Sequence, residues 1–533
     1  MKNSFIDLFR QPDDILVQTQ DSGIRFEEPK ERTVSPTKIE YVYSDKEARV
    51  IVHPCKIPLK RVKLRWNNRN FEIERVLNDC FDRCTNNLAW DCMKPDRELP
   101  WYFATYDGER THCYGVKTGC NSLCFWQIDP YGVSLWLDIR NGGNGVELIE
   151  PLIAAIVISR EGEEGETAFT ACQEFCKIMC DMPKMPKQPV FGVNNWYWAY
   201  GNVTYESVMK ETAYLAELAS DAVCKPYMVI DDGWQPLRHN NNWGNYIGGP
   251  WNGCNMGFTD MEKTAADISE YGCIPGLWFR ALLTAKRLPD EMLLKRPAAV
   301  MNCGQVMDPS NPETLHEVFT DARCISDWGF KLIKHDFSTS DITGGIIASD
   351  GWNFYDRTKT TAQITKKFYE TIQQGANDAI VIGCNTYSHL TAGIHEIHRS
   401  GGDTSGRLWE YTRRNGVNSF MRLVQNGTFY NIDPDCAAFT ERVSNELNIK
   451  FLELCAITGS TTLASITPGI LNTEEKRKIR EIYKIASMKG NCAEPLDWLN
   501  TSCPSRFLYK DNEYFFDWYS GYNGVRMFPT WMA

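Results

Sequence analysis

Two short segments of the sequence each end on an acid that follows a cation. They are residues 332–336, which read LIKHD, and residues 398–403, which read HRSGGD. Each begins as a strand-like run, and a buried strand has no structural need for a carboxylate at its end. Two carboxyl groups in different environments, aimed at one site, are what cleavage of a glycosidic bond requires.

The two acids, Asp336 and Asp403, are suited to different roles. Lys334 precedes Asp336 by two positions, so the two side chains point to the same side of a strand. A nearby cation keeps a carboxylate ionised, as a nucleophile requires. Asp403 would then hold a proton as the general acid and lose it for the base role once the charge of Asp336 is consumed. For retention of configuration, the two carboxyl groups need to lie about 5–5.5 Å apart.

Beyond a proline-rich stretch at residues 182–189, apolar strand-like runs alternate with amphipathic helical stretches. The runs cover residues 190–195, 227–231, 274–279, 331–336, 379–384, 394–399, 428–432 and 461–466. Helical stretches cover residues 206–222, 259–271, 312–328, 359–376, 408–425 and 441–457. This alternation predicts an α/β fold with a (β/α)8 barrel over residues 186–490.

Chemistry in such barrels lies at the carboxyl ends of the strands. Polar or aromatic residues stand at nearly every predicted strand end, and buried polar groups are costly unless they have partners. We therefore predict a ligand site, in which Asp231 and Asp232 bind sugar hydroxyls and tryptophans wall the ring. Its residues at the strand ends include Trp196, Asp231, Asp232, Trp234, Trp278, Arg280, Lys334, Cys384, Asn385, Arg399 and Asp435.

Two smaller β regions flank the predicted barrel. Short strand-like runs separated by turns such as Asp107-Gly108 predict an N-terminal β-sandwich domain over residues 1–185, ending in a helix near 167–180. Aromatic-rich runs after residue 490 predict a small C-terminal β appendage over residues 491–533.

The composition of the chain limits the classes of partner that it is expected to bind. The net charge of −11 argues against a nucleic-acid or anionic-membrane binder. We see neither a signal peptide nor a membrane span, which predicts a cytoplasmic protein whose 20 cysteines are mainly thiols, with disulfides or a metal as lesser alternatives. No phosphate-binding glycine loop or metalloprotease motif is present. We expect a glycoside or oligosaccharide partner, no cofactor and no metal, and a homo-oligomer is an open alternative.

Several of these motifs resemble the α-galactosidase clan of retaining glycoside hydrolases, families 36 and 27. In the order of the family, they are DDGW at 231–234, PGLW at 275–278, KHD at 334–336, RSGGD at 399–403 and DPD at 433–435. A β-sandwich before the barrel is more like family 36, while the last two motifs are more like family 27. The resemblance implies Asp336 as nucleophile and Asp403 as acid/base, with the sugar gripped by Asp231, Asp232, Lys334 and Arg399.

The sequence departs from the family at two strand ends. Arg280 stands where many family 36 members have an acidic pair. After strand five, galactose-specific family 27 members have Cys-Glu-Trp, whereas this chain has Cys384-Asn385-Thr386. That element contacts the substituent on sugar carbon 2, so the resemblance implies that Asn385 and Ser388 control the choice between galactose and N-acetylgalactosamine.

These observations predict a retaining exo-α-glycosidase, foremost an α-galactosidase acting on terminal α-linked galactose. Within the class, an α-N-acetylgalactosaminidase and a galactosyl transferase of the raffinose-synthase kind are alternatives. Outside it, a non-catalytic sugar-binding barrel and a phosphosugar-metabolising barrel are alternatives. The presence of both Asp336 and Asp403 speaks against the first of these, and the absence of a good phosphate site near the last two strands speaks against the second.

Overall fold

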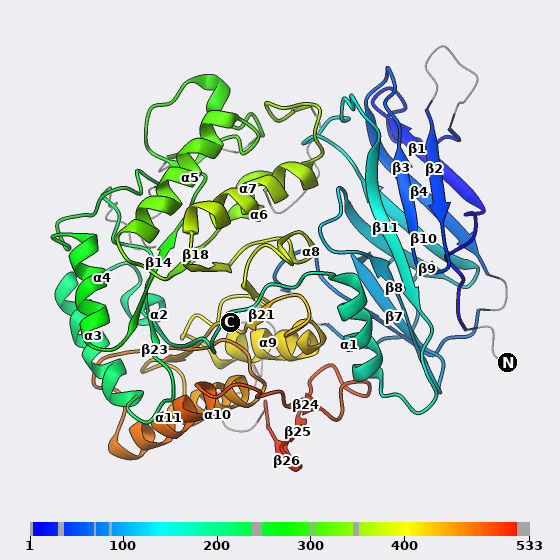
Figure 1. Cartoon of the computed structure of the whole chain (residues 1–533). Helices are drawn as coiled ribbons and strands as arrows, with labels where there is room; N and C mark the ends of the chain where they lie inside the picture. Colours follow the sequence, from blue (N-terminus) through cyan, green and yellow to red (C-terminus); the bar gives the residue numbers. More distant parts are fainter. Residues whose placement is uncertain are drawn as a thin grey trace, which may run out of the picture.

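The computed structural model describes residues 4–29, 37–68, 71–84, 88–236, 248–297, 300–301, 304–344 and 351–519. Figure 1 shows a β-sandwich beside a barrel, with helix α1 (Ala168–Met179) between them. Among the helices of these residues, none is both long and apolar enough to cross a membrane.

The N-terminal domain consists of two antiparallel sheets. One has the order β1 (Asp14–Thr19), β4 (Leu59–Asn67), β10 (Gly132–Asp138), β9 (Leu123–Asp129) and β6 (Leu99–Pro100). The other has the order β2 (Ile39–Tyr43), β3 (Ala48–Val52), β11 (Leu152–Arg160), β8 (Thr111–Val116), β7 (Tyr102–Tyr106) and β5 (Arg75–Asn78). Alternate residues of β4 are buried, and its Trp66 meets Tyr41 of the opposite sheet, so the core lies between the sheets.

A nine-stranded parallel sheet forms the barrel. In chain order its strands are β12 (Phe191–Asn194), β13 (Tyr227–Ile230), β14 (Ile274–Phe279), β18 (Leu332–His335), β19 (Ile380–Gly383), β20 (Ile397–Arg399), β21 (Asn431–Asp433), β22 (Cys436–Phe439) and β23 (Thr462–Ile466). All eight predicted strand runs contain or overlap an observed strand, and the predicted barrel fold is confirmed.

The ninth strand results from a break in the seventh. Strand β21 pairs with β20, whereas β22 pairs with β23, and only Pro434 and Asp435 separate them. Asp435 has a φ of 68°, which bends the chain there. The amide of Thr461 donates to the carbonyl of Ile432, so the two halves of the broken strand close the barrel. The predicted run at 428–432 therefore begins too early and misses β22.

Helices cover the outside of the barrel, as Figure 1 shows. They are α3 (Tyr205–Leu218), α4 (Met261–Glu270), α5 (Pro312–Asp327), α7 (Thr361–Ala376), α9 (Trp409–Met421), α10 (Asn445–Ile457) and α11 (Thr473–Ala486). Most have an N-cap side chain, such as Thr204 before α3 and Asn311 before α5, which explains why they begin where they do. Three short helices follow strands directly: α2 (Trp196–Ala199), α6 (Ser338–Thr343) and α8 (Ser388–Thr391).

Three further segments complete the described fold. A 3-10 turn η1 (Asp290–Met292) and the strands β15 (Leu283–Thr284), β16 (Val300–Met301) and β17 (Gly304–Val306) lie between β14 and α5. A second 3-10 turn, η2 (Leu423–Gln425), follows α9. The C-terminal strands β24 (Glu494–Pro495), β25 (Arg506–Tyr509) and β26 (Asn512–Phe515) form a separate sheet, beyond which buried Trp518 stacks on Trp409.

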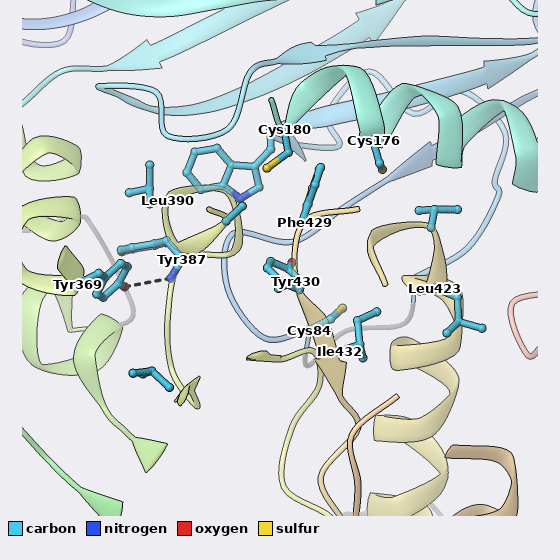
Figure 2. Close-up of a cluster of buried hydrophobic side chains, with 14 of the residues drawn as sticks. Cys84, Cys176, Cys180, Tyr369, Tyr387, Leu390, Leu423, Phe429, Tyr430 and Ile432 are labelled. Atoms are coloured by element: carbon cyan, nitrogen blue, oxygen red, sulfur yellow. Dashed lines mark hydrogen bonds between the residues drawn. The ribbon is translucent and has the colours of Figure 1, made fainter. Parts of the chain in front are cut away.

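The two large domains share an apolar interface. Figure 2 shows Cys176 and Cys180 near barrel residues such as Phe429 and Tyr430, with Cys84 beside Ile432. Cys84 belongs to the N-terminal domain but lies in a loop that follows β5. Bonds to Thr339, Ser388 and Ser400 hold that loop near the carboxyl ends of strands β18, β19 and β20.

Candidate active site

Asp336 directly follows β18, where the chain turns sharply. Phe337 adopts a φ of 64°, an uncommon conformation for a non-glycine residue that often marks functional sites. The amide of Phe337 donates to Asp336 Oδ1 over 2.7 Å, Trp278 Nε1 donates to Oδ2 over 3.2 Å, and the side-chain amide of Asn385 donates to Oδ1. Three donors from three different segments therefore fix the carboxylate.

The charges around Asp336 keep it ionised. Burial acts to raise the pKa of this carboxyl, but the cations of Lys334 and Arg83 and the bonds from Asn385 and Trp278 outweigh burial and lower the pKa to about 2. The predicted effect of Lys334 on the neighbouring acid is thus present. An ionised carboxylate held by neutral donors is the state in which an acid acts as a nucleophile.

Lys334 itself makes its direct ion pair with Asp231. Its Nζ lies 2.6 Å from Asp231 Oδ2, and the same oxygen accepts a bond of 2.7 Å from Asn194 Nδ2. All three side chains are nearly fully buried. Strands β12, β13 and β18 thereby contribute one polar network, which places two of the predicted sugar-binding residues beside the nucleophile candidate.

Asp232 is held differently from its neighbour. Gln235 Nε2 donates to Asp232 Oδ1 over 2.6 Å, and the side chain is 3% exposed. Burial raises the pKa of Asp232 well above its ordinary value, and the charges of Asp231 and Asp336 raise it further. This carboxyl group therefore favours its protonated form, which can donate a hydrogen bond as well as accept one.

Asp403 lies in a glycine-containing segment after β20. Its Oδ1 is 2.9 Å from Arg83 Nη1 and 3.5 Å from Arg399 Nη1. Removal from water raises the pKa of Asp403, as do the charges of Asp435 and Asp336, while Arg83 and Arg399 oppose the rise. The side chain is 53% exposed, so solvent weakens all of these effects. This carboxyl is the more readily protonated of the pair.

Arg399 links Asp403 to the broken seventh strand. Its Nε lies 3.0 Å from Asp433 Oδ2 and its Nη2 lies 3.0 Å from Asp435 Oδ1. Asp435 Oδ2 accepts bonds from the Tyr197 hydroxyl and from the amide of Thr404. The DPD motif thus orients Arg399 and anchors the chain one residue after Asp403.

The structure therefore brings most of the predicted residues together. Hydrogen bonds link Asn385 and Trp278 to Asp336. Ion pairs link Lys334 to Asp231, and Arg399 to Asp403 and Asp435. The charge of Asp336 raises the pKa of Asp403, and the charges of both acids raise the pKa of Arg83. Trp196 is partly exposed in α2 beside Tyr200, on the same side of the barrel.

Two of the residues predicted to contact the sugar are buried against protein partners. Trp234 exposes no surface: its indole donates to the carbonyl of Trp278 over 2.8 Å and packs against Trp251, so it supports the site from behind. Ser388 is also fully buried, and its hydroxyl faces the carbonyls of Cys80 and Phe81. Both side chains have internal partners, and a sugar contact by either remains a prediction.

Arg280 and Cys384 are held by protein partners as well. Arg280 forms a buried pair of 2.5 Å with Asp341 and stacks over the ring of Phe337 at 4.1 Å. It therefore supports the turn that follows the nucleophile candidate. Burial raises the pKa of the Cys384 thiol, which favours the protonated, unreactive form. A sugar contact by either side chain remains a prediction.

The buried histidines have structural partners. His335 faces His395 at 3.1 Å between their Nε2 atoms, and His389 stacks on Trp101. Burial lowers the pKa of both His335 and His389 to about 4, which favours the neutral ring. Within the described ranges, no group of three histidine, cysteine, aspartate or glutamate side chains is arranged to hold a metal ion.

Sequence reasoning missed Arg83. It comes from the loop of the N-terminal domain after β5, 320 positions before Asp403. No pattern in the sequence marks it, because its role depends on how the two domains pack. Tyr197 was missed as well, although its position one residue after Trp196 at a strand end was a usable signal.

Comparison with known proteins supports the fold. No protein-family model matches the sequence, and no curated protein sequence is significantly similar. The structure resembles TtGalA, an α-galactosidase from Thermus thermophilus, in its complex with p-nitrophenyl α-D-galactopyranoside, with a TM-score of 0.61 and 16% identity over 90% of this chain and 96% of that chain. A complex of the same enzyme with stachyose gives a TM-score of 0.59 and 17% identity over 84% and 96% of the two chains.

A second enzyme extends the likeness. The family 36 α-galactosidase AgaA from Geobacillus stearothermophilus gives a TM-score of 0.57 and 13% identity over 94% of this chain and 80% of that chain. The sandwich and the barrel together therefore have the architecture of family 36 α-galactosidases. The resemblance predicted from the motifs is confirmed at the level of the fold.

Proposed function

We propose that this protein is a retaining exo-α-galactosidase. The observation that carries the proposal is the pair of carboxyl groups at the ends of β18 and β20: the pKa of Asp336 is lowered and that of Asp403 is raised. Two acids whose pKa values are shifted in opposite directions are typical of a nucleophile and a general acid. The fold shared with α-galactosidases supports galactose as the sugar.

In this proposal, Asp336 attacks carbon 1 of the galactosyl group while Asp403 gives its proton to the leaving oxygen. The resulting glycosyl-enzyme has lost the negative charge of Asp336, so the pKa of Asp403 falls. Asp403 then takes a proton from water, which attacks carbon 1 and releases galactose with its configuration retained. Lys334, Asp231 and Asp232 bind the hydroxyls of the sugar.

The test compares Asp336→Asn and Asp403→Asn on an activated aryl α-galactoside and on an unactivated oligosaccharide. Asp336→Asn removes the nucleophile, so both substrates lose turnover. Asp403→Asn removes only proton donation, so the glycosyl group still leaves from a good leaving group such as dinitrophenolate, and azide partly restores turnover with net retention. Asp378→Asn, an exposed ion-paired acid, is the matched control.

Two results would contradict the proposal. Inverted stereochemistry of the first product would exclude double displacement. If Asp403→Asn lost as much activity on the activated substrate as on the unactivated one, as Asp336→Asn should, the assigned roles would be excluded. A wild-type enzyme that prefers an α-N-acetylgalactosaminide in the same panel would replace galactose as the sugar while leaving the mechanism in place.

A further inference from the structure

Arg83 is the one charged side chain from the N-terminal domain that the described structure pairs with a proposed acid of the site. Its guanidinium lies 2.9 Å from Asp403, and 27% of the side chain is exposed. Arg83 also responds to the charge of Asp336, so it stands near both acids. An arginine beside a general acid is unexpected, because a cation disfavours the protonated form that the acid needs.

The backbone around Arg83 is fixed to the backbone that leads to Asp403. The amide of Cys84 donates to the carbonyl of Ser400 over 2.9 Å, and Cys84 and Gly401 form a parallel β-bridge. In this parallel register, Arg83 lies opposite Ser400, which is three positions before Asp403. At Gly401 a Cβ atom would lie 1.8 Å from Asn415 Oδ1, so glycine is needed for the close approach.

A buried cation of the barrel, Arg422, binds both of these backbone segments. Arg422 donates to the carbonyl of Asp82 over 3.0 Å and to that of Ser400 over 2.9 Å, and it forms an ion pair of 2.8 Å with Asp79. Asp79 and Arg422 are each 1% exposed. The loop therefore has few ways to move relative to the end of β20.

Further contacts hold the loop from its other side. The amide of Ser388 donates to the carbonyl of Phe81 over 3.0 Å, and Thr339 donates to Asp82 over 3.2 Å. These partners lie in α8 and α6, the short helices after β19 and β18. The loop is thus anchored near the ends of three adjacent barrel strands, β18, β19 and β20.

We propose that Arg83 is a positioning residue that orients the carboxyl group of Asp403 for proton transfer to the leaving oxygen. The inference rests on the proposed function. Asp403 has 53% of its side chain exposed, and its shortest ion pair is the one with Arg83, at 2.9 Å against 3.5 Å for Arg399. The charged hydrogen bond to Arg83 restrains the carboxyl group, since such bonds are stronger and more directional than neutral ones.

The other groups that face Asp403 define what the arginine adds. Arg399 at the end of β20, Asp435 after β21 and Asp336 after β18 all act on its charge. The charge of Asp403 in turn raises the pKa values of three neighbouring groups. They are the hydroxyls of Tyr197 and Tyr200 in the α2 segment and the thiol of Cys384 after β19. Arg399 is already engaged by Asp433 and Asp435, so Arg83 is the cation most available to Asp403.

The test uses Arg83→Gln, Arg83→Lys and the control Arg49→Gln, which breaks an exposed ion pair with Glu47 far from the site. Arg83→Gln should lower kcat/KM for an unactivated α-galactoside about tenfold to hundredfold, a part of the usual gain from general acid catalysis. A dinitrophenyl α-galactoside, whose leaving group needs no proton, should lose far less. Arg83→Lys should recover part of the loss.

The pH profile separates orientation from a structural role. Removing the cation raises the pKa of Asp403, so the basic limb of kcat/KM should move up by about one unit in Arg83→Gln and little in Arg83→Lys. A loss that is equal for both substrates, with an unmoved basic limb, overturns the inference. If the wild type hydrolyses α-galactosides and Arg83→Gln has the same kcat/KM on both substrates and the same pH profile, the inference is overturned. The proposed function would then stand.

A structural readout does not depend on turnover. A crystal structure of Arg83→Gln should show the Asp403 carboxyl group rotated or in more than one rotamer, with Cys84 still bonded to Ser400. An unchanged, single Asp403 rotamer overturns the inference even if the wild-type enzyme proves inactive on every galactoside.

Discussion

Asn385 gives the most direct way to test the charge state of the proposed nucleophile. Its side-chain amide donates to Asp336 Oδ1, and this bond helps to hold the pKa of Asp336 at about 2. The substitution Asn385→Asp keeps the size of the side chain but replaces a donor with a second carboxylate. Asp336 would then lose a bond and gain a like charge within hydrogen-bonding distance.

The size of the effect follows from Coulomb's law. Two unit charges about 3 Å apart at an effective dielectric constant of about 20 repel by about 5 kcal/mol, or roughly 4 pKa units. Coupled aspartate pairs in other enzymes separate by about 3 units. The first protonation of the pair formed by Asp336 and the introduced carboxylate should therefore occur near pH 5 to 6, and it belongs to the pair rather than to either acid.

The assay is kcat/KM for a dinitrophenyl α-galactoside between pH 4 and pH 8. For the wild type, the acid limb set by Asp336 lies below this range, because its pKa is about 2. For Asn385→Asp we expect at least a tenfold fall between pH 7 and pH 4, as the nucleophile becomes protonated. Asn500→Asp, which adds the same charge at an exposed turn, is the control. A variant whose profile stays flat down to pH 4 would refute the assignment of Asp336 as an ionised nucleophile.

Three other perturbations test different parts of the structure. Trp278→Phe removes the indole donor to Asp336 and should lower kcat about tenfold, with KM changing less, as steady-state kinetics would show. Arg422→Met leaves Asp79 buried without its cation and should reduce the free energy of unfolding by about 3–5 kcal/mol, measured with urea. Burial raises the pKa of Glu211 from 4.5 to about 8, so the folded state binds this proton more tightly and stability falls as pH rises from about 4.5 to about 8. Glu211→Gln should therefore stabilise the protein above pH 8, by at most about 5 kcal/mol, and have little effect near pH 4 in thermal unfolding.

The barrel was predictable because its strands are buried on both faces. Runs such as Ile274–Phe279 are almost continuously apolar, which is typical of parallel strands covered by helices. Polar residues can then stand only at the ends, so the acids at 231, 336 and 403 were visible as exceptions to the pattern. The same logic failed at the seventh strand, because a two-residue break at Pro434 and Asp435 divides a short apolar run into two.

Side-chain direction was less predictable than position. Trp234 follows a strand end and Ser388 begins a short helix at another, yet both point into the protein. Trp234 packs on Trp251, and Ser388 meets a loop of the other domain. A sequence pattern places a residue on the correct rim of the barrel, but the neighbour that it faces depends on segments far away in the chain.

The structure gives Asn385, which departs from the family pattern after strand five, a second role beside Asp336. The sequence predicted that Asn385 and Ser388 contact the substituent on carbon 2 of the sugar, and in the structure Ser388 is fully buried. The side-chain amide of Asn385 donates to Asp336, so Asn385 supports the proposed nucleophile whether or not it also contacts the sugar. Asn385→Glu therefore tests two things at once. A change in the ratio of galactoside to N-acetylgalactosaminide hydrolysis reports carbon-2 recognition. A raised acid limb, caused by the added charge beside Asp336, reports the state of the nucleophile. If the limb rises while the ratio stays constant, residue 385 acts on the chemistry alone, and the carbon-2 contact lies on another strand end.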